Sequence, residues 1–170
     1  MFKLSFSFFR LAGNNDLVPR GSLVGSSGDM FYITNTHCLL TLSGVNIVNN
    51  DADGALLRVV GNSASRGWGT AGSNGAQVEF AADGQTLAGD IIVDTISNLT
   101  MTMKNGSTFT GTINIIDNAE GGTAVSGNAV VTIENGCTWN LTATARLRAS
   151  PTTAPSTSTA IPSRWQTARC

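Results

Sequence analysis

The chain has 170 residues, of which 12% are charged and 41% hydrophobic, and its formal net charge is -1. This length supports one domain with a sizeable core, while the near-neutral charge argues against nucleic acid as a partner. No segment approaches the roughly 20 apolar residues of a membrane-spanning helix, so we expect no membrane span.

The first segment, residues 1–25, contains a recognisable processing sequence. Residues 17–22 read LVPRGS, which is identical to the thrombin cleavage site used in expression vectors. We therefore expect this segment to be vector-derived or irregular, and we leave it out of the fold prediction. Residues 1–9 also have the order of a signal peptide, although the apolar stretch is short and Arg10 interrupts it; that alternative stays open.

Residues 26–142 are predicted to form the domain. Short runs of alternating apolar and polar residues are separated by clusters of Gly, Asn, Asp and Ser, and no helical period is sustained. This pattern is typical of β-strands joined by tight turns. The expected strands are 31–36, 40–42, 45–47, 55–60, 77–80, 87–93, 97–103, 109–115, 130–133 and 139–141, with irregular loops at 61–75 and 117–122.

One strand-turn-strand pattern occurs three times around Gly84, Gly106 and Gly136. Each copy has an Asp-Gly or Asn-Gly step, a Thr two residues after the Gly, and a large apolar residue directly after that Thr. A repeat of this length with a two-residue alternation inside it predicts a coiled stack of strands. Because one coil cannot bury its own apolar face, neighbouring coils must stack to form a core. The predicted fold is therefore an all-β, single-domain parallel β-helix, which is a solenoid.

Alignment on the turn glycines predicts which side chains form columns through the stack. Leu87, Phe109 and Trp139 form one inward column, and Ile91 with Ile113 and Val93 with Ile115 form two more; the threonines Thr86, Thr108 and Thr138 are expected to point outward. Cys38 and Cys137 lie several coils apart, too far for a disulfide, so we expect two free thiols.

The last segment, residues 143–170, differs from the rest in composition. Asp and Glu are absent from it, and it contains three of the four prolines. One interpretation is a disordered Pro/Ser/Thr linker. The other is a frameshifted tail, because the shifted reading frame of residues 155–159 must alternate apolar and polar residues whatever the wobble bases are. If the tail is frameshifted, it does not cap the last coil, which favours self-association through the open strand edges.

Four stretches, 31–36, 66–70, 89–94 and 104–111, resemble bacterial adhesin-like surface proteins. The resemblance covers roughly residues 26–142. It implies a right-handed β-helix of the pectin-lyase type and an extracellular or cell-surface location, and some of these relatives are described as carbohydrate-binding. It supplies no catalytic residues.

Two sets of residues are candidates for binding. Arg66, Trp68 and Asn74 lie in a glycine-rich loop, where an indole can stack on a sugar ring and a guanidinium can bind a carboxylate or a hydroxyl pair. Asp90 and Asp94 are four residues apart and are candidates for a calcium site, although no cofactor is required. The lone histidine, His37, is expected at the surface or at a sheet edge rather than in a catalytic set.

These observations predict a non-catalytic module that binds a polysaccharide or surface glycan, or serves as a structural stalk, and not an enzyme. A polysaccharide lyase or hydrolase of the same fold is the alternative, because such enzymes use clustered carboxylates and a basic residue, here Arg58 or Lys104. Ice binding through the outward threonines is a minor alternative.

Overall fold

The structure is a computed structural model that describes residues 21–62 and 69–142. Within these ranges the chain is all-β and contains no helix, so no helix is long and apolar enough to cross a membrane. The strands are β1 (Gly21–Gly25), β2 (Phe31–Thr34), β3 (His37–Ser43), β4 (Val45–Asn49), β5 (Leu57–Val60), β6 (Gln77–Asp83), β7 (Thr86–Ala88), β8 (Ile91–Asp94), β9 (Asn98–Lys104), β10 (Thr108–Thr110), β11 (Ile113–Ile116), β12 (Ala129–Ile133) and β13 (Thr138–Asn140).

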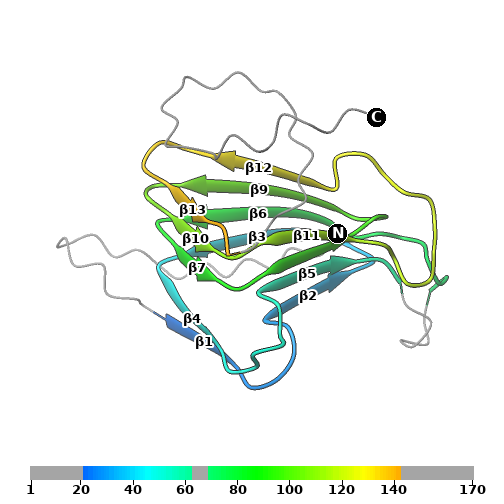
Figure 1. Ribbon diagram of the computed structural model, residues 1–170, viewed down its shortest axis with the longest axis horizontal. Coiled ribbons are helices and arrows are strands. Elements are labelled where there is room, and N and C mark those ends of the chain that lie inside the picture. Colours follow the sequence, from blue (N-terminus) through cyan, green and yellow to red (C-terminus); the bar gives the residue numbers. More distant parts are fainter. Residues whose placement is uncertain (1–20, 63–68, 143–170) are drawn as a thin grey trace.

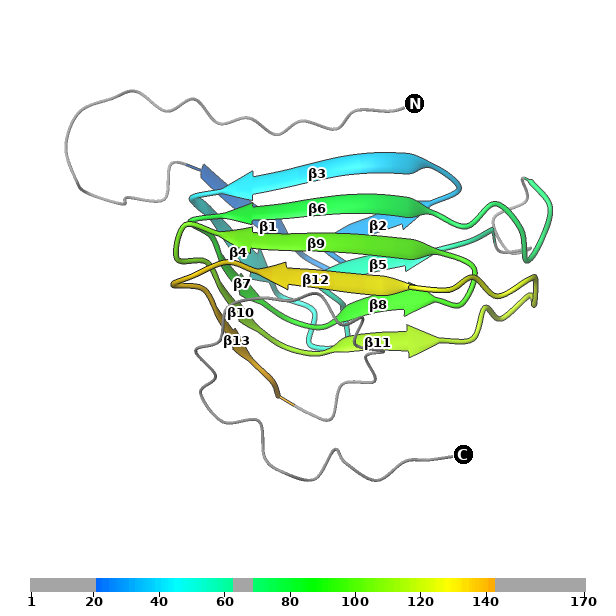
Figure 2. The same ribbon diagram turned by 90° about the horizontal axis from the view of Figure 1, so that it is seen from above.

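The strands pair in parallel with a regular offset of three. β2 pairs with β5, β5 with β8 and β8 with β11, while β3, β6, β9 and β12 form a second sheet in the same way. Figure 2 shows this second sheet with its four strands side by side in that order. A third set comprises the β1–β4 pair and the β7–β10–β13 sheet, between which no ladder forms. The described fold is thus a stack of parallel sheets, as the sequence pattern requires.

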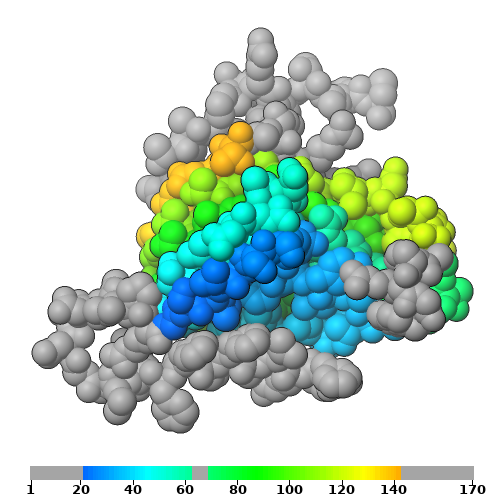
Figure 3. Space-filling model, turned by 90° about the horizontal axis from the view of Figure 1, so that it is seen from below, coloured from blue at the N-terminus to red at the C-terminus, as the bar shows by residue number. Residues whose placement is uncertain are grey.

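The β1 strand precedes Ser26, where we expected the domain to begin. Gly21 and Ser22, which end the thrombin-site sequence, pair with Val45 and Asn46 of β4. Residues 21–25 therefore belong to the described sheets. Figure 3 views the molecule from the side opposite to that of Figure 2, and there the segment from β1 to β4 forms much of the surface.

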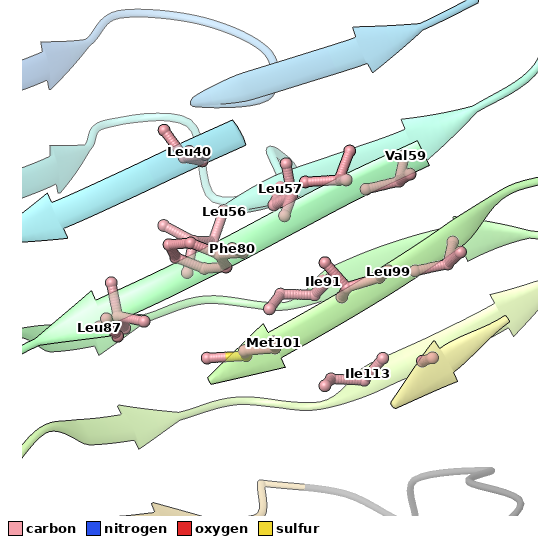
Figure 4. Packing of buried hydrophobic residues seen from close by; sticks show 14 of the residues in the cluster. Leu40, Leu56, Leu57, Val59, Phe80, Leu87, Ile91, Leu99, Met101 and Ile113 are labelled. Carbon is pink, nitrogen blue, oxygen red and sulfur yellow. The ribbon is translucent and has the colours of Figure 1, made fainter. Parts of the chain in front are cut away.

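The core lies between the inner faces of the sheets. On β6, Val78, Phe80 and Ala82 are buried, and the two residues between them are more exposed. Phe80 pairs in register with Leu40 on β3 and Met101 on β9, so large apolar side chains stack in columns. Figure 4 shows these side chains meeting those of β5, β8 and β11 across the interior. Each such burial stabilises the fold by about 1.5–3 kcal/mol.

The predicted columns are confirmed by the strand register. Leu87, Phe109 and Trp139 are neighbours across β7, β10 and β13, and the rings of Phe109 and Trp139 stack with centroids 5.5 Å apart. Ile91 pairs with Ile113, and Val93 with Ile115. Both Cys38 and Cys137 are free thiols, as expected.

The sequence prediction of single strands at 87–93 and 109–115 was wrong. Each run is divided at a glycine, Gly89 or Gly111, whose positive φ (112° and 156°) turns the chain from one sheet into the next. A Cβ at Gly111 would collide with the carbonyl group of Gly89. The alternation of apolar residues continues through these corners, because both sides of each corner face the same core.

Candidate functional site

A pocket of about 180 Å³ lies at one end of the sheet formed by β2, β5, β8 and β11. At this end the chain leaves β5 through the loop that begins at Gly61 and leaves β11 through the loop that begins at Asp117. Both loops project from the same end of the molecule (Figures 1 and 2). The pocket is lined by Tyr32, Arg58, Val60, Gly61, Asn62, Asp94, Ile116, Asp117, Asn118, Ala119 and Glu120.

Strand alternation places the polar part of this lining on the outer face of the sheet. Tyr32 and Arg58 are paired neighbours on β2 and β5, and they alternate with the core residues Leu57 and Val59. The Arg58 guanidinium is held by Asp29, with Nε donating to Oδ2 at 2.5 Å and a second nitrogen donating to Oδ1 at 3.3 Å. This bidentate pair fixes the position of Arg58 beside the pocket.

The last residue of β8, Asp94, joins the two loops. Its Oδ2 atom accepts hydrogen bonds from the Gly61 backbone N–H at 2.7 Å and from Asn118 Nδ2 at 2.5 Å. The residue is only 1% exposed, and no described residue donates a hydrogen bond to its Oδ1 atom. A buried acceptor without a donor destabilises a fold by about 1–3 kcal/mol. One carboxylate oxygen of Asp94 therefore accepts two hydrogen bonds, while the other accepts none from the described residues.

A second buried acceptor in the lining has the same property. Asn62 is 2% exposed, and its Nδ2 atom donates to the Thr70 carbonyl at 3.2 Å, but its Oδ1 atom has no donor among the described residues. Its backbone is well bound, since its N–H donates to the Ser73 carbonyl and its own carbonyl accepts from Gly72. Only the side-chain oxygen lacks a partner.

The second loop is organised around Asn118. Its backbone N–H donates to Thr95 Oγ1, its Nδ2 atom reaches Asp94, and its Oδ1 atom accepts from the Glu120 backbone N–H at 2.9 Å. These bonds hold the exposed residues Asp117 and Glu120 at the rim of the pocket. The pocket wall thus carries three carboxylates from two elements.

The two loops are in close backbone contact. A Cβ at Gly122 would collide with the carbonyl oxygen of Gly72, and a Cβ at Gly72 would lie close to the carbonyl oxygens of Glu120 and Gly121. Below them, Asn128 Nδ2 donates to the carbonyls of Asp94, Thr95 and Ser97, which fixes the turn after β8. The relative position of the loops is therefore set by glycine contacts and by amide side chains.

The residues predicted to bind carbohydrate are only partly described. Arg66 and Trp68 lie outside the described residues. Asn74 is exposed and adopts a left-handed backbone conformation (φ 55°) in the same loop, but it does not line the pocket. The same loop contributes Gly61 and Asn62 to the pocket, which is otherwise built from residues that the sequence prediction did not assign to carbohydrate binding.

The two aspartates proposed for calcium have separate roles. Asp90 lies before β8, and its Oδ1 atom accepts from the Thr112 backbone N–H at 2.9 Å, whereas Asp94 binds the two loops. Four residues of extended chain separate them by about 13 Å, which is too far for both carboxylates to bind one ion. Within the described ranges, no group of three or more His, Cys, Asp or Glu side chains is placed to hold a metal ion.

His37 is exposed on β3, an edge strand, as expected, and its Nε2 atom lies 3.0 Å from Glu79 Oε1. The two basic residues considered for a lyase both lie in ion pairs, Arg58 with Asp29 and Lys104 with Asp83 at 3.3 Å. Both positive charges are thus already neutralised locally.

Comparisons of the chain with protein-family models, with curated proteins and with solved structures found no match.

Proposed function

We propose that this chain is a right-handed parallel β-helix module of an adhesin-like, extracellular or cell-surface protein, and that it binds carbohydrate without cleaving it. The regular pairing of each strand with the strand three places on supports the β-helix. The right-handed sense follows from the strong preference of parallel strand connections for that hand. The location and the adhesin-like role rest on the sequence resemblance.

The observation that carries the binding proposal is the Asp94 carboxylate in the pocket wall, because one of its two oxygens has no hydrogen-bond donor among the described residues. Sugar ligands present many O–H donors on a compact ring, and buried acceptors without donors favour ligands of this kind. Tyr32 adds an aromatic surface and Arg58 a fixed donor on the same wall. The pocket is comparable in size to a cavity that holds a single six-membered ring.

A polysaccharide lyase or hydrolase is the second proposal, because the pocket wall includes the carboxylates of Asp94, Asp117 and Glu120. Glycoside hydrolysis requires one carboxyl group to act as a general acid and another as nucleophile or base. Asp94 is poorly suited to either role, since its Oδ2 atom already accepts two hydrogen bonds and its side chain is buried. Binding without turnover is therefore the better supported of the two.

Affinity electrophoresis against a panel of acidic, neutral and basic polysaccharides, with calcium and with chelator, tests the proposal. We expect retardation without loss of polymer length. Asp117→Asn removes an exposed charge of the pocket rim without touching the core, so it should alter the retardation, whereas the matched variant Asp53→Asn, in an exposed turn outside the pocket lining, should not. Trp68→Ala tests whether the adjoining loop contributes.

If the polymer were shortened, the chain would be an enzyme and not a binding module. A structural stalk, in contrast, would leave every polymer unretarded, and Trp68→Ala would then change no measured property.

A further inference from the structure

The described wall of the pocket beside Asp94 is largely apolar in area, and its charged side chains are mostly acidic. Its acidic and basic side chains are Asp94, Asp117, Glu120 and Arg58, and Arg58 is already paired with Asp29. The wall therefore presents an excess of negative charge on an otherwise nearly neutral chain. A ligand that complements it must supply donors and positive charge.

Two buried oxygens independently indicate the same chemistry. Asp94 Oδ1 and Asn62 Oδ1 belong to side chains at least 98% buried, and no described residue donates to either. The Asn62 oxygen is an acceptor only, because the donor end of its amide already binds Thr70, and the Asp94 atom is the second oxygen of a carboxyl group whose Oδ2 atom already accepts two hydrogen bonds. A primary ammonium group is the matching partner, because it carries three N–H donors, no acceptor and one positive charge.

We propose that this pocket recognises a primary ammonium group, and that the carbohydrate bound by the module is an amino-sugar polymer with free amines. This inference rests on the proposed carbohydrate-binding function and names the ligand class. The ammonium lies against the carboxylate wall, and the ring of the same sugar unit packs beside Tyr32.

The same wall excludes two other ligand classes. A uronate polymer would bring its carboxylates towards Asp94, Asp117 and Glu120, and each like-charged pair 4 Å apart costs about 1 kcal/mol in water and more at a protein surface. A calcium-bridged ligand is disfavoured because Ca²⁺ takes six to eight oxygen ligands, and the described residues offer no group of three acidic side chains placed to hold it.

The test uses three oligosaccharides of equal length: a glucosamine oligomer with free amines, its fully N-acetylated counterpart, and an oligogalacturonate. Binding to the full chain is measured by isothermal titration calorimetry at low salt with chelator present. N-acetylation removes the charge and two of the three donors while it keeps the ring, so the free-amine oligomer should bind at least about tenfold more tightly. The oligogalacturonate should not bind.

Variants locate the interaction. Asp117→Asn and Glu120→Gln each remove one rim charge and should weaken binding of the free-amine oligomer several-fold, while Asp53→Asn, which removes an equal charge outside the pocket lining, should leave it unchanged. The comparison separates the pocket from general attraction of a cationic polymer. Asp94→Asn should abolish the preference for the free amine, and its urea midpoint shows whether the fold is retained.

Each other outcome overturns the inference. Equal binding of the acetylated and free-amine oligomers would show that the module binds carbohydrate but does not recognise the amine. Equal weakening by Asp53→Asn and Asp117→Asn would show non-specific attraction, and spermidine binding as tightly as the oligomer would show that the sugar plays no part. Binding of the oligogalacturonate in calcium would identify a different ligand class. If no polymer bound, the proposed carbohydrate-binding function itself would be wrong.

Discussion

The side-chain amide of Gln85 binds the backbone of Val45 through both of its ends. Gln85 Oε1 accepts from the Val45 N–H at 2.9 Å, and Gln85 Nε2 donates to the Val45 carbonyl at 2.7 Å. These bonds lie where β4 and β7 are neighbours but form no ladder. A side chain thus replaces one peptide group of the sheet, and it joins the β1–β4 pair to the β7–β10–β13 sheet.

Gln85→Ala should be strongly destabilising. The variant leaves the N–H and the carbonyl of Val45 without partners, and also removes the bond from Nε2 to the Thr86 carbonyl. Since Gln85 is 2% exposed, these groups are buried, and we expect a loss of about 2–4 kcal/mol in the free energy of unfolding. Urea denaturation followed by circular dichroism measures it.

The matched control for Gln85 is Gln77→Ala, which truncates an exposed glutamine on β6. It should change the unfolding free energy by less than about 0.5 kcal/mol. If both variants had the same midpoint, the Gln85 amide would not be a stabilising link between the sheets.

Much of the sheet register could be predicted because it depends on a simple periodicity. Phe109 is apolar, follows a Thr and lies three residues after Gly106, and its two column partners occupy the same place relative to Gly84 and Gly136. The strand breaks at Gly89 and Gly111 were missed, because the inward alternation continues through each corner. The linking role of Gln85 has no periodic signal, since a single polar residue after a turn glycine gives no information about burial.

The pocket was predicted only in part for a related reason. The sequence singled out Asp94 only as a candidate calcium ligand paired with Asp90. Its actual partners, Gly61 and Asn118, are 33 and 24 residues away in sequence and belong to irregular loops. Contacts between loops follow no repeat, so the turn pattern that predicts the sheets contains no information about them.

Gly111→Ala should be far more damaging than Gly136→Ala. Both glycines have a positive φ, so each substitution places an alanine in a conformation that costs about 1–2 kcal/mol. At Gly136 the new methyl group would meet nothing within 4 Å, whereas at Gly111 it would collide with the Gly89 carbonyl. We expect Gly111→Ala to lower the free energy of unfolding by at least about 3 kcal/mol. Gly136→Ala should lower it only by the conformational cost.

Thermal and urea unfolding of both glycine variants measure the difference. Equal losses at the two positions would mean that the corner can relax around a methyl group, and that Gly89 and Gly111 are not closely stacked.

Cys38 should resist alkylation in the folded protein while Cys137 reacts. Cys38 is 4% exposed, and burial raises the pKa of its thiol, which lowers the thiolate fraction that attacks the reagent. Cys137 is half-buried near the end of the stack. At pH 8 we expect iodoacetamide to modify Cys137 at least about tenfold faster, because Cys38 is both less accessible and held back by its raised pKa.

Peptide mapping by mass spectrometry assigns the modified cysteines, and urea-unfolded protein is the control, in which the two rates should converge. Faster labelling of Cys38 in the native protein would place it outside the core and contradict the register of β3 with β6.

The turn before β5 should make folding stability depend on pH. The backbone N–H of Gly28, at 2.6 Å from Oδ2, lowers the pKa of the Asp51 carboxyl, and the N–H groups of Asp53 and Gly54 lower it further, against a smaller opposing effect of burial. A carboxyl whose pKa is lower in the folded state binds protons more readily when unfolded. Its contribution to stability is therefore present above the ordinary aspartate pKa, about 3.9, and is lost as the pH falls through the lower folded value.

Asp51→Asn removes this contribution, so the variant should be less stable than the parent chain at neutral pH. The difference should shrink as the pH falls below about 4, because the parent carboxyl then becomes protonated as well. Urea midpoints measured from pH 7 to pH 2.5 for both proteins test the trend, and NMR titration of the Asp51 carboxyl gives its folded pKa directly. A stability difference that stays constant across that range would show that the Asp51 bonds to Gly28 and Asp53 do not depend on its charge.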